Sequence, residues 1–296
     1  MSDQHSALDD LNPQQRAAVV HEGSPLLIVA GAGSGKTRVL TRRIAYLLSD
    51  RNVSPQEVLA ITFTNKAAGE MKERVLDLVG NKAKLMQVST FHSACVRFLR
   101  SDAQKLGRSS TFSIYDSQDS LRLITMIAAG LEINSKVLSP RSLASQISSL
   151  KSELIDHESY SRRVETEQER LVAQVYSEYD QRLARANAFD FDDLIGATVA
   201  LLQLFPDVKQ KFRKRFKHIL VDEYQDTNHA QYILIKELVG SSKDGMPAAE
   251  LCVVGDADQS IYAFRGAIIR NIEEFERDFP KDRKSTRLNS SHVSES

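Results

Sequence analysis

The hydrophobic positions of this chain follow two alternating patterns. Short, continuous apolar runs are typical of strands that are buried on both faces of a parallel sheet. The stretches between them carry apolar residues at helical spacing, such as Val39, Leu40, Ile44 and Leu47. The predicted strands are 25–30, 58–63, 85–90, 217–223 and 251–256. Strands that alternate with helices predict an α/β fold, in which a doubly wound parallel sheet carries helices on both faces.

The pattern changes in the middle of the chain. Residues 112–188 contain helical stretches and no convincing strand, and they are too long to form a loop. We therefore expect an all-helical subdomain inserted into an α/β domain that occupies residues 1–111 and 189–280. The last stretch, 281–296, is rich in serine and lacks periodicity, so we expect a disordered tail, unrelated to the rest of the chain.

Composition narrows the class of protein without identifying a partner. The 296 residues, 42% hydrophobic and 26% charged, are typical of a globular protein of about two domains. Lys+Arg and Asp+Glu both number 39, so any attraction for nucleic acid must be local. Cys95 and Cys252 lie far apart in apolar contexts, which indicates buried thiols in a reducing cytoplasm. The polar N-terminus is unlike a signal peptide, and no apolar run is long enough to span a membrane.

A glycine-rich turn follows the first predicted strand, in the sequence AGAGSGKTR at residues 30–38. Glycines let successive backbone N–H groups point at phosphate oxygens, and the start of the following helix adds its positive dipole end. This arrangement predicts a P-loop, in which Lys36 reaches the β- and γ-phosphates and the Thr37 hydroxyl binds Mg²⁺. The usual pattern opens with glycine, whereas this chain has Ala30. The expected phosphate-binding residues are Ala30, Gly31, Ala32, Gly33, Ser34, Gly35, Lys36 and Thr37.

A second motif supplies carboxylates. In HILVDEYQD, residues 218–226, an apolar strand ends in two adjacent acidic residues, at the edge where such sheets bind ligands. Asp222 is expected to complete the Mg²⁺ site, and Glu223 to orient and deprotonate the attacking water. The alternative is a solvated acidic strand end, which the neighbouring P-loop disfavours. These residues predict a nucleotide hydrolase and leave open what the hydrolysis drives.

Six motifs, one of which contains the acidic pair, occur in order along the chain. They are LNPQQRAAV (11–19), ITFTNKAAGEMKERV (61–75), STFHS (89–93), FDFDDL (189–194), VDEYQDTN (221–228) and VVGDADQSIYAFRGA (253–267). In this order and spacing, the chain resembles the N-terminal half of the UvrD/PcrA/Rep family of superfamily 1 DNA helicases, over residues from about 8 to 280. The resemblance implies a RecA-like P-loop NTPase domain with an inserted helical subdomain.

The resemblance also implies roles for residues outside the phosphate loop. Gln15 matches the glutamine that reads adenine. An amide can bond both the N6 donor and the N7 acceptor of adenine, which favours ATP over GTP. Arg38 matches a residue that packs on the adenine face. Gln259 matches a catalytic glutamine that contacts the γ-phosphate and links the ATP site to DNA. The residues that match the single-stranded DNA path are Phe63, His92, Tyr262, Phe264 and Arg265.

Several of these positions have simpler interpretations. Phe63 at a strand end could belong to the core, and His92 could be a hydrogen-bonded structural histidine.

Relatives commonly carry tryptophan where this chain has Phe264, and a basic residue where it has Ala263. The basic stretch 209–217 could touch DNA, but an exposed helix face with buried phenylalanines is favoured.

The resemblance implies an ATP-dependent DNA helicase that moves 3′ to 5′, with ATP and Mg²⁺ as cofactors and single-stranded DNA and duplex–single-strand junctions as partners. The family continues with a second motor domain, whereas the match ends near Pro280. We therefore expect that the isolated chain hydrolyses ATP poorly and does not unwind duplex DNA. Two alternatives stay open: a non-catalytic module that binds nucleotide and DNA, and the helicase part of a RecB/AddA-like helicase-nuclease. The short spacing before the insertion favours the compact helicases.

Overall fold

The chain divides into two compact units. The structure, a computed structural model, describes residues 7–23, 25–31, 33–241 and 245–256, residues 275 and 277, and the backbone of 284–288. The first unit comprises residues 1–91, 210–227 and 238–296, and the second comprises 92–209 and 228–237. The predicted insertion, 112–188, lies wholly inside the second unit. That unit extends beyond the insertion on both sides, so the predicted boundaries of the motor domain stay a prediction.

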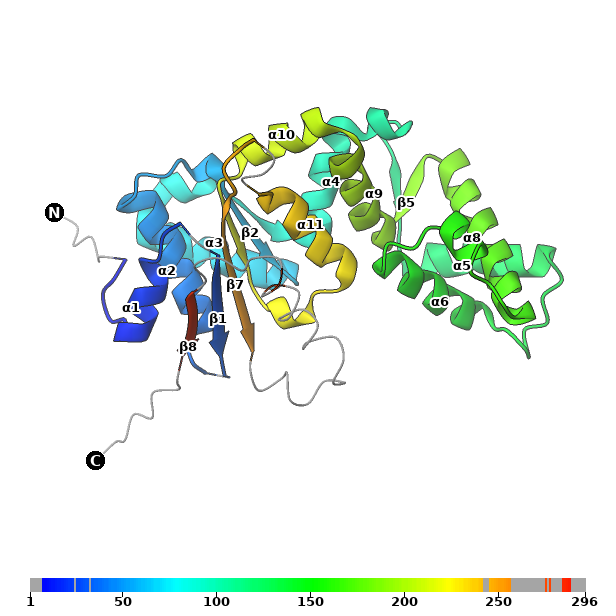
Figure 1. Cartoon of the computed structure of the whole chain (residues 1–296), viewed down its shortest axis with the longest axis horizontal. Coiled ribbons are helices and arrows are strands. Elements are labelled where there is room, and N and C mark those ends of the chain that lie inside the picture. Colours follow the sequence, from blue (N-terminus) through cyan, green and yellow to red (C-terminus); the bar gives the residue numbers. More distant parts are fainter. Residues whose placement is uncertain are drawn as a thin grey trace. The chain divides into compact units, whose positions relative to one another are not determined.

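A six-stranded parallel sheet forms the centre of the first unit (Figure 1), with the strand order β3–β2–β6–β7–β1–β8. Its strands are β1 (Leu26–Ala30), β2 (Val58–Thr62), β3 (Gln87–Thr90), β6 (His218–Val221), β7 (Glu250–Asp256) and β8 (Lys284–Leu288). The first five confirm the strands predicted from the apolar runs. Every residue of β2 and β6 is buried, as expected for inner strands covered on both faces.

Helices cover this sheet and provide most of the core on one face. The helices that lie wholly or mostly in the first unit are α1 (Pro13–Val19), α2 (Lys36–Ser49), α3 (Asn65–Val79) and α10 (Pro206–Arg215). Apolar side chains of α1, α2 and α3 pack on β1, β2, β6 and β7 in one continuous core. The apolar residues whose spacing predicted α2 therefore pack on the sheet. The first turn of α2 lies at the edge of the sheet where β1 ends.

Within the stretch that was expected to be disordered, residues 284–288 form β8. This strand pairs in parallel with β1, with Leu288 opposite Ala30. β8 could not be predicted from the sequence, because the residues KSTRL do not alternate between apolar and polar. An edge strand is held by backbone hydrogen bonds, which every residue except proline can supply.

The second unit is mostly helical. Its elements are α4 (Phe91–Asp102), β4 (Ser113–Tyr115), α5 (Ser117–Gly130), α6 (Pro140–Ser152), α7 (His157–Ser161), α8 (Glu167–Arg185), β5 (Ala188–Asp190), α9 (Phe191–Leu204) and most of α11 (His229–Val239). The expectation of an all-helical insertion is wrong in one respect, because β4 and β5 pair in a two-stranded parallel sheet. Strands of three residues are too short to show an alternating pattern.

Two further expectations concern side-chain burial. Phe212 on α10 and Phe216 just after it are both buried, while Lys211, Lys214 and Arg215 are exposed, which confirms the favoured interpretation of the basic stretch. Both cysteines are buried and form no disulfide. No helix in the described part of the chain is long and apolar enough to cross a membrane.

Candidate functional site

The glycine-rich turn lies between the end of β1 and the start of α2. Gly33 (φ +75°) and Gly35 (φ +82°) both have the left-handed backbone that favours glycine. The Ser34 hydroxyl donates to the Gly31 carbonyl at 2.7 Å, which closes the turn. Gly35 precedes α2 and offers no side chain to cap it, so the first N–H groups of the helix keep their capacity to bind an anion. Ala32 lies outside the described residues.

Lys36 extends from the first turn of α2 toward the ends of neighbouring strands. Its Nζ lies 2.7 Å from Oδ2 of Asp256 and 3.7 Å from Oε2 of Glu223. The sheet order explains this contact, because β7 lies beside β1 and Asp256 is opposite Ala30 in the register. The lysine that is expected to bind phosphate thus forms an ion pair with a buried aspartate, Asp256, which was not among the predicted site residues.

The acidic pair lies where β6 ends. Asp222 is buried, and its Oδ1 accepts the Glu223 N–H at 3.0 Å. Glu223 has a left-handed backbone (φ +49°), which turns its half-exposed side chain toward Lys36. Gln225 then bridges two strand ends: its Nε2 donates to Glu223 Oε2 at 2.6 Å, and its Oε1 accepts the Asp256 N–H at 3.0 Å. The loop, the acidic pair and the end of β7 therefore form one connected site.

This site concentrates negative charge. Burial, and after it the neighbouring Glu223, raises the pKa of Asp222 to about 6. The pKa of Asp226 is also raised, by burial and then by Glu223. Among the described residues, no group of three or more His, Cys, Asp or Glu side chains could hold a metal ion alone. The carboxylates at the end of β6 fit Mg²⁺, because this ion takes one or two carboxylates and completes its shell with water and substrate phosphate.

The raised pKa of Asp222 predicts a specific pH dependence of stability. The unfolded chain holds this carboxyl near its ordinary value of 3.8, so the folded protein binds the proton more tightly. The stability that this proton contributes is present below about pH 4 and is lost as the pH rises through about 6. As the pH rises from 4.5 to 7.5, the free energy of unfolding of Asp222→Asn should therefore increase relative to that of the wild type by about 1–3 kcal/mol.

Urea unfolding of both proteins at the two pH values measures this difference. Asp77→Asn, on the exposed face of α3, is the matched control. The prediction fails if the free energy of unfolding of Asp222→Asn, relative to the wild type, stays constant or falls from pH 4.5 to pH 7.5. That result would show that folding does not disfavour the charged form of Asp222.

The proposed adenine-binding residues flank the same loop. Gln15 is buried, its Nε2 donates to the Ser34 carbonyl at 3.2 Å, and its Oε1 accepts the Asn12 N–H at 3.2 Å. These bonds fix the amide orientation and leave one proton and one lone pair available. Arg38 is exposed, and its guanidinium donates to the Asp10 carbonyl at 2.7 Å.

Two of the five expected DNA-contacting residues fall in described parts of the chain. Phe63 is half-buried in the first unit and meets Phe91 edge to face, with ring centroids 5.6 Å apart. His92 is half-buried in the second unit and meets Phe191 edge to face, also at 5.6 Å. Burial lowers the pKa of His92. Gln259, Tyr262, Phe264 and Arg265 lie outside the described residues.

Three residues of these sites were missed by sequence reasoning. Asp256 and Gln225 lie inside quoted motifs, but their contacts depend on a strand order that the sequence does not state. Phe191, in the motif FDFDDL, keeps 43% of its surface exposed, which is unusual for so large an apolar side chain. Phe191 directly follows Asp190, which caps α9 in the structure.

Comparison with known proteins identifies relatives over nearly the whole chain. The UvrD/REP helicase N-terminal domain family matches residues 11–280. ATP-dependent DNA helicase UvrD1 of Mycobacterium tuberculosis is 65% identical over 281 residues, covering 93% of this chain and 36% of that protein. The Mycobacterium leprae UvrD1 is 61% identical over 282 residues, and ATP-dependent DNA helicase PcrA of Staphylococcus aureus is 50% identical over 277 residues. These two matches cover 92% and 94% of this chain. The chain thus spans only 36–37% of the length of these relatives.

Proposed function

Because the chain belongs to the UvrD/REP helicase N-terminal domain family, we propose that it is the ATP-binding and DNA-binding motor part of an ATP-dependent DNA helicase. The observation that carries this proposal is the convergence of Lys36, Asp222 and Glu223 at the carboxyl edge of one parallel sheet. The relatives' names describe ATP-dependent DNA helicases, and their greater length makes unwinding an activity proposed for the whole protein.

Each residue has a proposed role in nucleotide hydrolysis. The loop amides and Lys36 bind the β- and γ-phosphates, which requires Lys36 to leave Asp256 when a nucleotide enters. Thr37 and Asp222 would hold Mg²⁺, which neutralises phosphate charge when it is bound. Glu223 orients the attacking water and accepts its proton, and Gln225 holds that carboxylate in place. Gln259 keeps its predicted role as a γ-phosphate contact.

The proposed DNA surface uses aromatic side chains. Phe63 in the first unit, and His92 with Phe191 in the second, present rings that stack on bases without reading sequence. Tyr262, Phe264 and Arg265 complete the predicted set. Single-stranded DNA is the proposed ligand, with junctions to duplex DNA and 3′-to-5′ movement proposed for the whole protein in the cytoplasm.

Selection of adenine provides a first test. Gln15→Ala should reduce the preference of the chain for ATP over GTP by about 10-fold, because an amide bonded to both edge atoms of adenine is worth about 1–3 kcal/mol. Competition of each nucleotide against a fluorescent ATP analogue measures the ratio. Gln14→Ala, the exposed neighbour on α1, is the control. Equal competition by GTP and ATP in the wild-type chain would refute the role of Gln15.

Binding of single-stranded DNA provides a second test. Phe191→Ala and Phe63→Ala should each weaken binding by about 5- to 50-fold, and by a similar factor for every base sequence, because stacking is worth about 1–3 kcal/mol per base. Fluorescence anisotropy with labelled oligonucleotides at two salt concentrations measures the loss. Leu204→Ala, an exposed apolar side chain at the end of α9, is the control. A loss confined to one base sequence would contradict stacking.

A further inference from the structure

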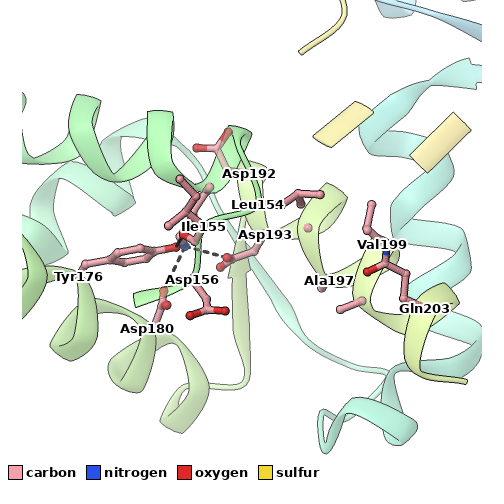
Figure 2. Close-up of a pocket in the computed structure, with 13 residues that line it drawn as sticks. Leu154, Ile155, Asp156, Tyr176, Asp180, Asp192, Asp193, Ala197, Val199 and Gln203 are labelled. Atoms are coloured by element: carbon pink, nitrogen blue, oxygen red, sulfur yellow. Dashed lines mark hydrogen bonds and ion pairs between the residues drawn. The ribbon is translucent and has the colours of Figure 1, made fainter. Parts of the chain in front are cut away.

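A lysine is buried among three aspartates in the second unit. The Nζ of Lys151, on α6, lies 2.7 Å from Asp193 Oδ1, 2.9 Å from Asp190 Oδ2 and 3.3 Å from Asp180 Oδ1. Asp180 comes from α8 and Asp193 from the first turn of α9, and Figure 2 shows both directed into the pocket that they line. Only 5% of the Lys151 side chain is exposed. One ammonium group of α6 therefore contacts both α8 and the turn between β5 and α9.

Two of these aspartates flank Phe191. Asp190 caps α9 by accepting the Asp193 N–H at 2.7 Å, and Asp193 Oδ2 accepts the Asp190 N–H at 3.2 Å. The second oxygen of Asp190 accepts both Lys151 Nζ and the Tyr179 hydroxyl, each at 2.9 Å. The turn that carries Phe191 is thus fixed on both sides through Lys151.

Burial of the charged groups and the attraction between Lys151 and the aspartates act in opposite directions on this cluster. Burial alone would lower the pKa of Lys151, but Asp193, Asp190 and Asp180 together raise it well above its ordinary value. Burial raises the pKa of Asp193 to about 7, against the opposing effect of Lys151. Buried ion pairs add little net stability compared with apolar residues of similar size, because desolvation offsets the attraction. A role in fixing geometry explains the cluster better than a role in stability.

We propose that Lys151 is a positioning residue, which holds the turn at Asp190–Asp193 so that Phe191 is presented beside His92 as part of the DNA surface. This inference rests on the proposed DNA-binding function of Phe191. Lys151 does not touch DNA itself, because its ammonium group is enclosed by the three carboxylates.

The chain has no tryptophan, so Phe191→Trp places a single fluorescent reporter on this turn. In that background, Lys151→Met should raise the acrylamide quenching constant of the tryptophan about twofold and weaken single-stranded DNA binding about fivefold. Lys105→Met is the matched control, because Lys105 forms an exposed ion pair with Asp207 in the same unit. The control should change neither value.

A second variant guards against simple unfolding. Lys151→Met leaves three carboxylates without the lysine's positive charge. Lys151→Met with Asp193→Asn leaves two carboxylates, and so keeps the formal charge of −2 that one ammonium and three carboxylates carry. Circular dichroism establishes that it is folded. The proposal predicts increased quenching and weaker DNA binding in this folded variant.

Unchanged quenching in the folded double variant would overturn the positioning role. Increased quenching with unchanged DNA affinity would also overturn it, provided that Phe191→Ala weakens binding. If Phe191→Ala itself binds DNA normally, the proposed DNA surface has failed, which is a separate result from the state of the turn.

Discussion

Glu223→Gln should leave the affinity for Mg-ATP within about twofold of the wild type and slow hydrolysis by about 10²- to 10⁴-fold, the usual contribution of a positioned general base. Glutamine has the shape of glutamate and can still accept the hydrogen bond that Gln225 donates. It cannot accept a proton from water. The variant should therefore bind nucleotide and fail in chemistry.

Single-turnover hydrolysis, with the chain in excess over radiolabelled ATP, measures this rate even when turnover is slow. Glu73→Gln, on the exposed side of α3, controls for the loss of one negative charge. Equal hydrolysis by Glu223→Gln and the wild type would remove Glu223 from the mechanism. A wild-type chain that binds ATP without hydrolysing it would favour the alternative of a non-catalytic binding module.

Lys36→Ala should weaken Mg-ATP binding by about 10- to 100-fold. A hydrogen bond to a charged group is worth about 1.5–3 kcal/mol, and each 1.4 kcal/mol is a factor of ten in affinity. The substitution also removes the ammonium group that contacts the buried carboxylate of Asp256, close to where phosphates would enter. Both effects act in the same direction.

Titration with a fluorescent ATP analogue measures the affinity. Lys66→Ala, an exposed lysine on α3, is the control for the loss of a positive charge. Lys36→Arg separates charge from geometry, because the larger guanidinium retains the charge but does not fit the space of an ammonium group. Unchanged affinity in Lys36→Ala would contradict the P-loop assignment.

Much of this fold could be predicted because inner parallel strands have an unmistakable pattern. β2 and β6 are apolar at nearly every position, and the glycines of the turn at 31–35 mark the end of β1. Elements held mainly by backbone hydrogen bonds escaped prediction. β4 has three residues, two of them exposed, and the KSTRL sequence of β8 has no apolar face to recognise.

The candidate sites show the same division. Lys36, Asp222 and Glu223 could be proposed from local sequence, because Lys36 ends the glycine-rich turn after β1 and the acidic pair directly follows β6. The partner of Lys36 could not, since Asp256 is 220 positions away and reaches Lys36 only through the order of strands in the sheet. Lys151 looks like any surface lysine in SLKSEL, and only tertiary packing reveals that it is buried.

The backbone of Glu223 has a further consequence, for the evolution of the chain. A residue with a side chain pays conformational strain of about 1 kcal/mol or more in the left-handed region, which glycine would avoid. Selection for folding alone would thus drive this position toward glycine, whereas selection for the proposed hydrolysis would retain glutamate. A library of variants sorted for thermal resistance would enrich glycine at position 223, and a library sorted for turnover would eliminate it.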